Sequence, residues 1–96
     1  MESVERKVFE AEGHSRVEIL ILPDLFGGRP AAYIHKVYTD SEHQGKGLAS
    51  GLVREAIEYA KMKGCYKVFL VCREGIAPFY ERFGFQKGQV EMRLKL

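Results

Sequence analysis

This 96-residue sequence has few cysteines, short apolar runs and only a small excess of positive charge. Its two cysteines, Cys65 and Cys72, form no CxxC pair, so they predict neither a disulfide framework nor a zinc site, and we expect no metal. The apolar runs, such as residues 68–72, are far shorter than the ~20 residues that span a membrane. Fifteen Lys and Arg residues against thirteen Asp and Glu residues give a net charge of +2 without a basic tract, which argues against nucleic-acid binding.

The length and the beginning of the chain set its expected organisation. A chain of this size forms one domain with a thin core, so we expect residues 1–96 to be a single compact domain. Residues 1–5 are charged and lack the apolar segment of a signal peptide, which predicts a cytoplasmic location.

Hydrophobic periodicity predicts three strands in the first 39 residues. Residues 8–11 and 17–22 are rich in β-forming side chains and flank Gly13-His14-Ser15, which is typical of a hairpin. A Pro-Asp and Gly-Gly-Arg-Pro turn between residues 23 and 30 leads into a third strand at 31–39. These segments predict an antiparallel meander.

The next segments predict a helix followed by a parallel strand. Apolar residues recur every four positions from Leu48 to Ala60, which predicts a core-facing helix over 46–63 that ends at Gly64. Residues 66–72 are apolar on both faces except for Lys67, which predicts a central strand covered on two sides. A right-handed crossover would place this strand parallel to 31–39.

Two further elements complete the predicted order. Residues 75–85 contain proline near the beginning and Gly84 near the end, which predicts a short helix. Residues 90–96 alternate strictly between apolar and polar side chains, which predicts a strand with one buried face. The order β-β-β-α-β-α-β indicates an α/β (α+β) fold with a mixed central sheet.

A glycine-rich loop lies where the third strand leads into the first helix. Glycines allow backbone angles that other residues avoid, so the unpaired N–H groups of the first helical turn can converge on a phosphate. A plain glycine-rich turn opening a surface helix would have the same pattern. The candidate cofactor-binding residues are Gln44, Gly45, Lys46, Gly47, Leu48, Ala49 and Ser50.

The spacing of Gln44, Gly47 and Ala49, with the Phe-Tyr-x-x-x-Gly-Phe segment at 79–85, resembles the GNAT superfamily of acetyl-CoA-dependent N-acetyltransferases. The resemblance implies the GNAT acyl-CoA N-acyltransferase fold, with acetyl-CoA as co-substrate and a small-molecule amine as acceptor. It also implies that strand amides around Val37 and Tyr38 polarise the thioester carbonyl, and that Tyr80 gives a proton to the departing thiolate.

From about Arg29 onward the chain is similar to the glucosamine-6-phosphate N-acetyltransferase family, through Gly-Cys-Tyr-Lys at 64–67 and Val-Glu-Met-Arg-Leu-Lys at 90–95. This resemblance implies that Tyr66, Lys67 and Lys95 hold the sugar phosphate. Without it, both lysines would be interpreted as ordinary solvated strand residues.

The chain departs from that family at positions that matter for the acceptor. His35-Lys36 replaces an acidic pair, Val71 replaces an acidic residue and Ile76 replaces an asparagine. The family is also longer at the N-terminus, where extra helices form part of the acceptor pocket. These differences favour either a different amine or a pocket that a second subunit completes.

The general base is the open chemical question. His35 is one hypothesis, because imidazole exchanges protons readily near neutral pH. Bulk water is the alternative, and Glu42 and His43 are expected to shape the turn before the glycine loop. The regular apolar face of 90–96, with the thin core and the short N-terminal region, predicts a homodimer that exchanges this strand about a hinge at 86–89.

Two other classes of function stay open. One is a catalytically silent GNAT domain that binds acetyl-CoA as a sensor or interaction module. The other is a structural or subunit-interaction protein without a cofactor, in which the glycines around Lys46 only form a turn. Stabilisation by acetyl-CoA separates the second class from the others, and release of CoA separates the first class from an enzyme.

Overall fold

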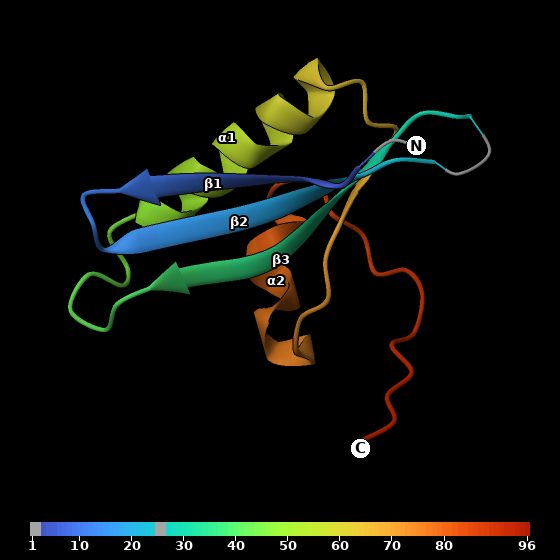
Figure 1. Ribbon diagram of the computed structural model, residues 1–96. Coiled ribbons are helices and arrows are strands. Elements are labelled where there is room, and N and C mark those ends of the chain that lie inside the picture. The colour runs from blue at the N-terminus through green and yellow to red at the C-terminus, as the bar shows by residue number, and fades with distance from the viewer. Residues whose placement is uncertain (1–2, 25–26) are drawn as a thin grey trace.

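The computed structural model describes residues 3–24 and 27–96. The expected turn at 23–30 and the charged beginning of the chain therefore each fall partly outside the described residues. Figure 1 shows the long strands side by side, with one helix lying across them. The elements in chain order are β1 (Glu5–Ala11), β2 (Ser15–Leu22), β3 (Ala31–Thr39), α1 (Leu48–Met62), β4 (Val68–Phe69), a 3₁₀ turn (Glu74–Ile76) and α2 (Ala77–Glu81).

The predicted antiparallel meander is confirmed. β1 pairs with β2, and β2 pairs with β3, both antiparallel. The β1–β2 hairpin turns through Glu12 and Gly13, whose φ angles of 54° and 71° are left-handed. These strands place Val17, Ile19 and Ile21 on one face of the sheet, where all three are buried.

The helix α1 covers this apolar face. Its buried residues, Leu52, Val53, Ala56 and Ala60, follow the predicted period and join the strand residues in one core cluster. The helix begins at Leu48, two residues later than predicted, because Gly47 has a φ of 79° and lies outside the right-handed region. It ends as predicted: Gly64 has a φ of 77°, and the Cys65 N–H donates to the Ala60 carbonyl over 3.0 Å.

The strand predicted at 66–72 is parallel to β3, but it is short and lies at the edge of the sheet. Only two residue pairs join it to β3, Ala32 with Val68 and Tyr33 with Phe69. The sheet order among the described residues is β1-β2-β3-β4. Tyr66 is 54% exposed and Val71 is 56% exposed, so the prediction of a central strand covered on both faces is wrong for this chain.

The prediction of a terminal strand is also wrong for the single chain. Residues 90–96 form no strand, and Figure 1 shows the C-terminus extending away from the sheet. Val90, Met92 and Leu94 are each more than 80% exposed. An alternating pattern shows that a segment is able to bury one face, but burial needs a partner surface, and the described residues provide none.

The second predicted helix is present in a shortened form. A 3₁₀ turn precedes the five residues of α2, with Pro78 in its first turn. Gly84 follows with a φ of 97°, and its N–H donates to the Glu81 carbonyl over 3.0 Å. Tyr80 of α2 is 8% exposed and belongs to the same core cluster as α1. No helix within residues 3–24 and 27–96 is long and apolar enough to cross a membrane.

Candidate functional site

The glycine-rich loop leads directly into α1 and leaves the first turn of that helix open. Gly45 and Gly47 have φ angles of 81° and 79°, which only glycine adopts without strain. The first bond of the helix runs from the Gly51 N–H to the Gly47 carbonyl over 3.1 Å, and no side chain in the described part of the sequence caps this end. The N–H groups of residues 48–50 therefore have no partner within the helix and are free to bind an anion.

Polar contacts tie both sides of this loop to the sheet and to α2. The Gln44 amide donates to the Thr39 carbonyl at the end of β3 over 3.2 Å. The Arg82 guanidinium lies 3.4 Å from the Ser50 hydroxyl, which links the end of α2 to the first turn of α1. The loop and the helix that carries Tyr80 are thus neighbours, although they lie about thirty residues apart.

Beside the loop, no strand among the described residues pairs with β3 on the β4 side beyond Tyr33. The two strands pair only at Ala32 and Tyr33, whereas β3 continues to Thr39. Val37 is half-buried against the core, and Tyr38 is 62% exposed. This open strand edge is where the resemblance predicts that backbone amides bind the thioester carbonyl.

A β-bulge lies at His35. The register of β2 with β3 shifts here: Glu18 pairs with Lys36 and Ile19 pairs with Ile34, so His35 has no direct partner. Bulges occur frequently next to active sites because they redirect a side chain. The His35 Nε2 atom is buried and 3.3 Å from a Glu18 carboxylate oxygen, but it makes no hydrogen bond with the described residues.

Glu18 is the functional candidate that the sequence did not reveal. Its side chain is 2% exposed and is surrounded by cationic groups from three strands. Arg16 donates to it at 2.7 and 3.1 Å, Arg6 also donates to it, and the Lys36 ammonium lies 3.9 Å away. The hydrogen bonds from Arg16, and then from Arg6, lower the pKa of Glu18 to about 2 despite its burial.

Tyr80 lies inside the core with its ring edge-on to Phe79 at 4.9 Å and to Phe85 at 5.9 Å. Burial, and to a smaller extent the neighbouring Cys72 thiol, raises the pKa of Tyr80. The phenol is therefore protonated at neutral pH, as it would be at its ordinary pKa, and this is the state that a proton donor requires.

The predicted phosphate-binding residues are only partly brought together. Tyr66 and Lys67 are adjacent and exposed, with the Lys67 ammonium 5.5 Å from the Tyr66 ring and 5.2 Å from the Phe69 ring. Lys95 belongs to the extended C-terminal segment, which the single chain does not pair with the sheet. The structure therefore places two of these three residues in one region.

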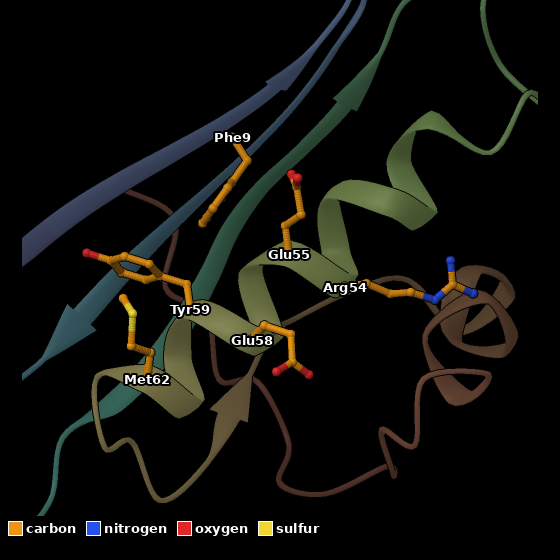
Figure 2. Close-up of a pocket in the computed structure, with 6 residues that line it drawn as sticks. All are labelled: Phe9, Arg54, Glu55, Glu58, Tyr59 and Met62. Carbon is orange, nitrogen blue, oxygen red and sulfur yellow. The ribbon is translucent and has the colours of Figure 1, made fainter.

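A shallow groove of about 410 Å³ lies elsewhere, between β1 and α1. Figure 2 shows Phe9 of β1 facing the α1 side chains Tyr59 and Glu55 across it. The groove contains neither the glycine loop nor Tyr80 nor His35. None of the predicted site residues lines this groove. We therefore assign the candidate site to the loop and the open edge of β3.

The fold has a helix, α1, that begins after a glycine-rich loop, and two parallel strands, β3 and β4, that pair over only two residues. These features define an α/β protein of the N-acetyltransferase type. The sequence pattern of the acetyltransferase (GNAT) family matches residues 8–85. The chain therefore belongs to the acetyltransferase (GNAT) family.

Several proteins that this chain is similar to are named as acetyltransferases. A glucosamine 6-phosphate N-acetyltransferase of Trypanosoma brucei brucei is 41% identical over 70 residues, which cover 73% of this chain and 48% of that protein. A solved Trypanosoma brucei acetyltransferase is 35% identical with a TM-score of 0.85, over 97% of this chain and 69% of the other.

The glucosamine-6-phosphate N-acetyltransferase of Arabidopsis thaliana superimposes with a TM-score of 0.81 at 28% identity, over 96% of this chain and 66% of that one. The chain spans about half the length of the curated relatives it matches. The predicted GNAT fold is thus confirmed.

Acid stability tests the charge cluster around Glu18. Its pKa in the folded chain, about 2, lies below the ordinary value of 4.5, so the ionised carboxylate stabilises the fold fully above pH 4.5. This contribution falls progressively as the pH drops toward about 2. We expect the urea midpoint of the unaltered chain to fall more steeply over this interval than that of Glu18→Gln, which removes the charge and keeps the shape.

The quantity to compare is the difference in urea midpoint between the unaltered chain and Glu18→Gln at each pH. A single curve is not enough, because Glu5 and Asp40 also have lowered pKa values. Glu74→Gln is the matched control, since that carboxylate is 82% exposed. It should retain the pH dependence of the unaltered chain. Parallel curves for the unaltered chain and Glu18→Gln would show that the cluster does not stabilise the fold.

Proposed function

We propose that this chain transfers an acetyl group from acetyl-CoA to a primary amine, with glucosamine 6-phosphate as the best acceptor. The observation that carries the proposal is the pair of left-handed glycines, Gly45 and Gly47, directly before the uncapped start of α1. Membership of the GNAT family supports the use of acetyl-CoA. The named activity of the relatives at 36–41% identity supports the choice of acceptor.

The residues around the loop fit the diphosphate of the cofactor. The free N–H groups at 48–50 donate to anionic oxygens, the exposed Lys46 adds a positive charge, and nothing lies within 4 Å of a Cβ built at Gly45 or Gly47. When bound, acetyl-CoA supplies an acetyl thioester that an amine nitrogen can attack. Strand amides around Val37 and Tyr38, where β3 has an open edge, would bind the developing oxyanion. Because successive N–H groups of a strand point to opposite edges, one of these two residues would be the donor.

Two side chains would move the protons. Tyr80 would donate its phenolic proton to the leaving sulfur, since a phenol carries that proton at neutral pH. His35 would take the proton from the amine on Nδ1, and the buried Glu18 carboxylate, 3.3 Å from Nε2, would stabilise the cationic ring. The bulge that frees His35 from strand pairing supports this role.

Tyr66 and Lys67 would bind the phosphate of the acceptor, with Lys95 joining them if the C-terminal segment pairs with a sheet. A lysine ammonium neutralises phosphate as a point charge, and the Tyr66 phenol adds a hydrogen bond. The replacement of an acidic pair by His35-Lys36 favours a second candidate, a domain that binds acetyl-CoA without turning it over.

A CoA-release assay tests the proposal. The chain is incubated with acetyl-CoA and each of a panel of amino sugars, polyamines and peptide amines, beginning with glucosamine 6-phosphate, while the Tm is measured with acetyl-CoA alone. We expect a raised Tm and release of CoA with the sugar phosphate. A raised Tm without turnover on any amine would support the silent domain, and an unchanged Tm would refute cofactor binding.

Replacing Tyr80 by phenylalanine separates catalysis from packing. Phenylalanine keeps the ring contacts in the core and removes only the proton donor, so kcat should fall by about 100-fold or more while the affinity for acetyl-CoA is retained. Tyr59→Phe is the matched control, because Tyr59 is a half-buried α1 tyrosine bonded to Glu5. A kcat within a few-fold of the unaltered enzyme in Tyr80→Phe would exclude Tyr80 as the general acid.

His35→Gln tests the proposed base through the pH profile. The variant should lose the acidic limb of kcat/KM, since glutamine cannot accept the amine proton, and its residual rate should rise with the fraction of neutral amine. Lys36→Gln, one residue along β3, controls for a change of charge beside Glu18. An unchanged pH profile in His35→Gln would assign the base to water.

We also propose a cytoplasmic homodimer in which residues 90–96 of each chain pair with the other. The exposure of Val90, Met92 and Leu94, each above 80%, supports an association that buries them. Light scattering at micromolar concentration should give twice the chain mass. Met92→Lys/Leu94→Lys should give the monomer mass, whereas Met62→Lys on α1 should leave the dimer intact. A monomer mass for the unaltered chain would contradict the proposal.

A further inference from the structure

Three side chains converge near the turn that joins β1 to β2. His14 lies in the turn between β1 and β2, and Asp40 and His43 lie just after β3. The Nδ1 atom of His14 is 2.8 Å from one carboxylate oxygen of Asp40, and the Nδ1 atom of His43 is 2.6 Å from the other. One ligand atom from each residue lies within 4.8 Å of the others. We call these residues the His-Asp-His cluster.

The two imidazole rings stack almost in parallel, with 3.5 Å between their centroids and 7° between their planes. Aromatic pairs usually prefer offset or edge-on arrangements with centroids 4.5–7 Å apart. Here both Nδ1 atoms contact one carboxylate, so Asp40 holds the two rings beside each other. Because an ion bound to imidazole lies close to the ring plane, the two rings would tilt out of this stack to share one ion.

Main-chain bonds hold the cluster in place. The Asp40 N–H donates to the His14 carbonyl over 2.9 Å, and the His43 N–H donates to the Asp40 carbonyl over 3.0 Å. The neighbouring Ser15 hydroxyl lies 2.8 Å from the Thr39 hydroxyl and bonds the Tyr38 carbonyl. The backbone thus brings the three possible metal ligands together from segments 26 residues apart. Binding of an ion would therefore cost little conformational entropy.

We propose that the His-Asp-His cluster binds one divalent transition-metal ion through the Nδ1 atoms of His14 and His43 and the carboxylate of Asp40. Zn²⁺ is the chemical class expected, because two imidazoles and one carboxylate suit zinc and its neighbours, whereas Mg²⁺ and Ca²⁺ require mostly oxygen ligands. The proposal does not rest on acetyl transfer.

Small movements would bring the donors to the spacing of this ion. Zinc binds imidazole nitrogen at about 2.0–2.1 Å and carboxylate oxygen at about 2.0–2.2 Å, so two donors at a tetrahedral ion lie about 3.3–3.5 Å apart. The separations of 2.6 and 2.8 Å are those of hydrogen bonds, so each pair would open by less than about 1 Å as the ion replaces the Nδ1 proton. On binding, each Nδ1 gives up its proton, and the neutral ring keeps a proton on Nε2 or returns it there from solvent.

The charge and the exposure of the cluster suit a cation from solution. Asp40 adds a carboxylate, an oxygen ligand that zinc accepts beside imidazole nitrogen. The side chains are 24–41% exposed, which gives an ion a path of entry and leaves a coordination position for water. The bound ion would join the β1–β2 turn to the segment that leads into the glycine loop.

Titration of the full chain with Co²⁺, and competition by Zn²⁺, tests the proposal. The chain is prepared without a histidine tag and treated with a chelator that is then removed. We expect one equivalent of Co²⁺ to give visible ligand-field absorption without a sulfur charge-transfer band, and Zn²⁺ to displace it. At a Zn²⁺ concentration 100 times Kd, Tm should rise by about 10 °C.

Variants assign the ligands. His14→Ala and His43→Ala should each weaken binding by more than about 100-fold, beyond the loss caused by removing an outer partner of a metal ligand. His35→Ala should bind with unchanged affinity, because His35 is the remaining histidine of the chain and faces Glu18. Circular dichroism confirms that each variant is folded. Asp40→Asn, which keeps the shape of the side chain, serves if an alanine variant does not fold.

Three results would overturn the proposal. The first is the absence of Co²⁺ absorption at millimolar metal. The second is binding that survives in the His14→Ala/His43→Ala double variant. The third is a sulfur charge-transfer band, which would move the ion to Cys65 or Cys72. Failure of the CoA-release assay would leave this result unaffected, so the two proposals are tested independently.

Discussion

The free N–H groups at the beginning of α1 are the feature on which the candidate site depends. Gly47 has a left-handed backbone and no side chain caps the helix, so its first turn remains available to an anion. A serine or aspartate in that position would have satisfied one of these donors internally. The remainder of the site is arranged around this open turn, with β3 leading into it and α2 bonded to it through Arg82 and Ser50.

A second constraint is the way in which β3 leaves its neighbours. On one side its pairing with β4 stops at Tyr33, and on the other a bulge releases His35 from the β2 register. Both irregularities expose main-chain or side-chain groups that a regular sheet would have paired. The buried Glu18 carboxylate beside His35 then concentrates charge at the bulge, where Arg6, Arg16 and Lys36 balance it.

Local patterns predicted the hairpin, the meander, α1 and the position of the glycine loop, because each depends on contacts between residues close in sequence. The terminal strand and the central position of β4 were wrong, since burial of residues 90–96 and 66–72 requires a partner that periodicity does not identify. Glu18 was missed for a related reason: its cationic partners come from three strands, and only the register reveals them. The His-Asp-His cluster also depends on tertiary proximity, so its turn residues carried no recognisable spacing.

The most direct test of the account is a titration of the isotopically labelled chain with CoA, followed by amide resonances in NMR spectra. Binding of the diphosphate to the helix start predicts that the largest shifts fall on the N–H groups of residues 45–50, and that pantetheine, which lacks the diphosphate, leaves them unchanged. Shifts confined to other segments, or equal shifts with pantetheine, would contradict the central claim that α1 begins at a phosphate-binding turn.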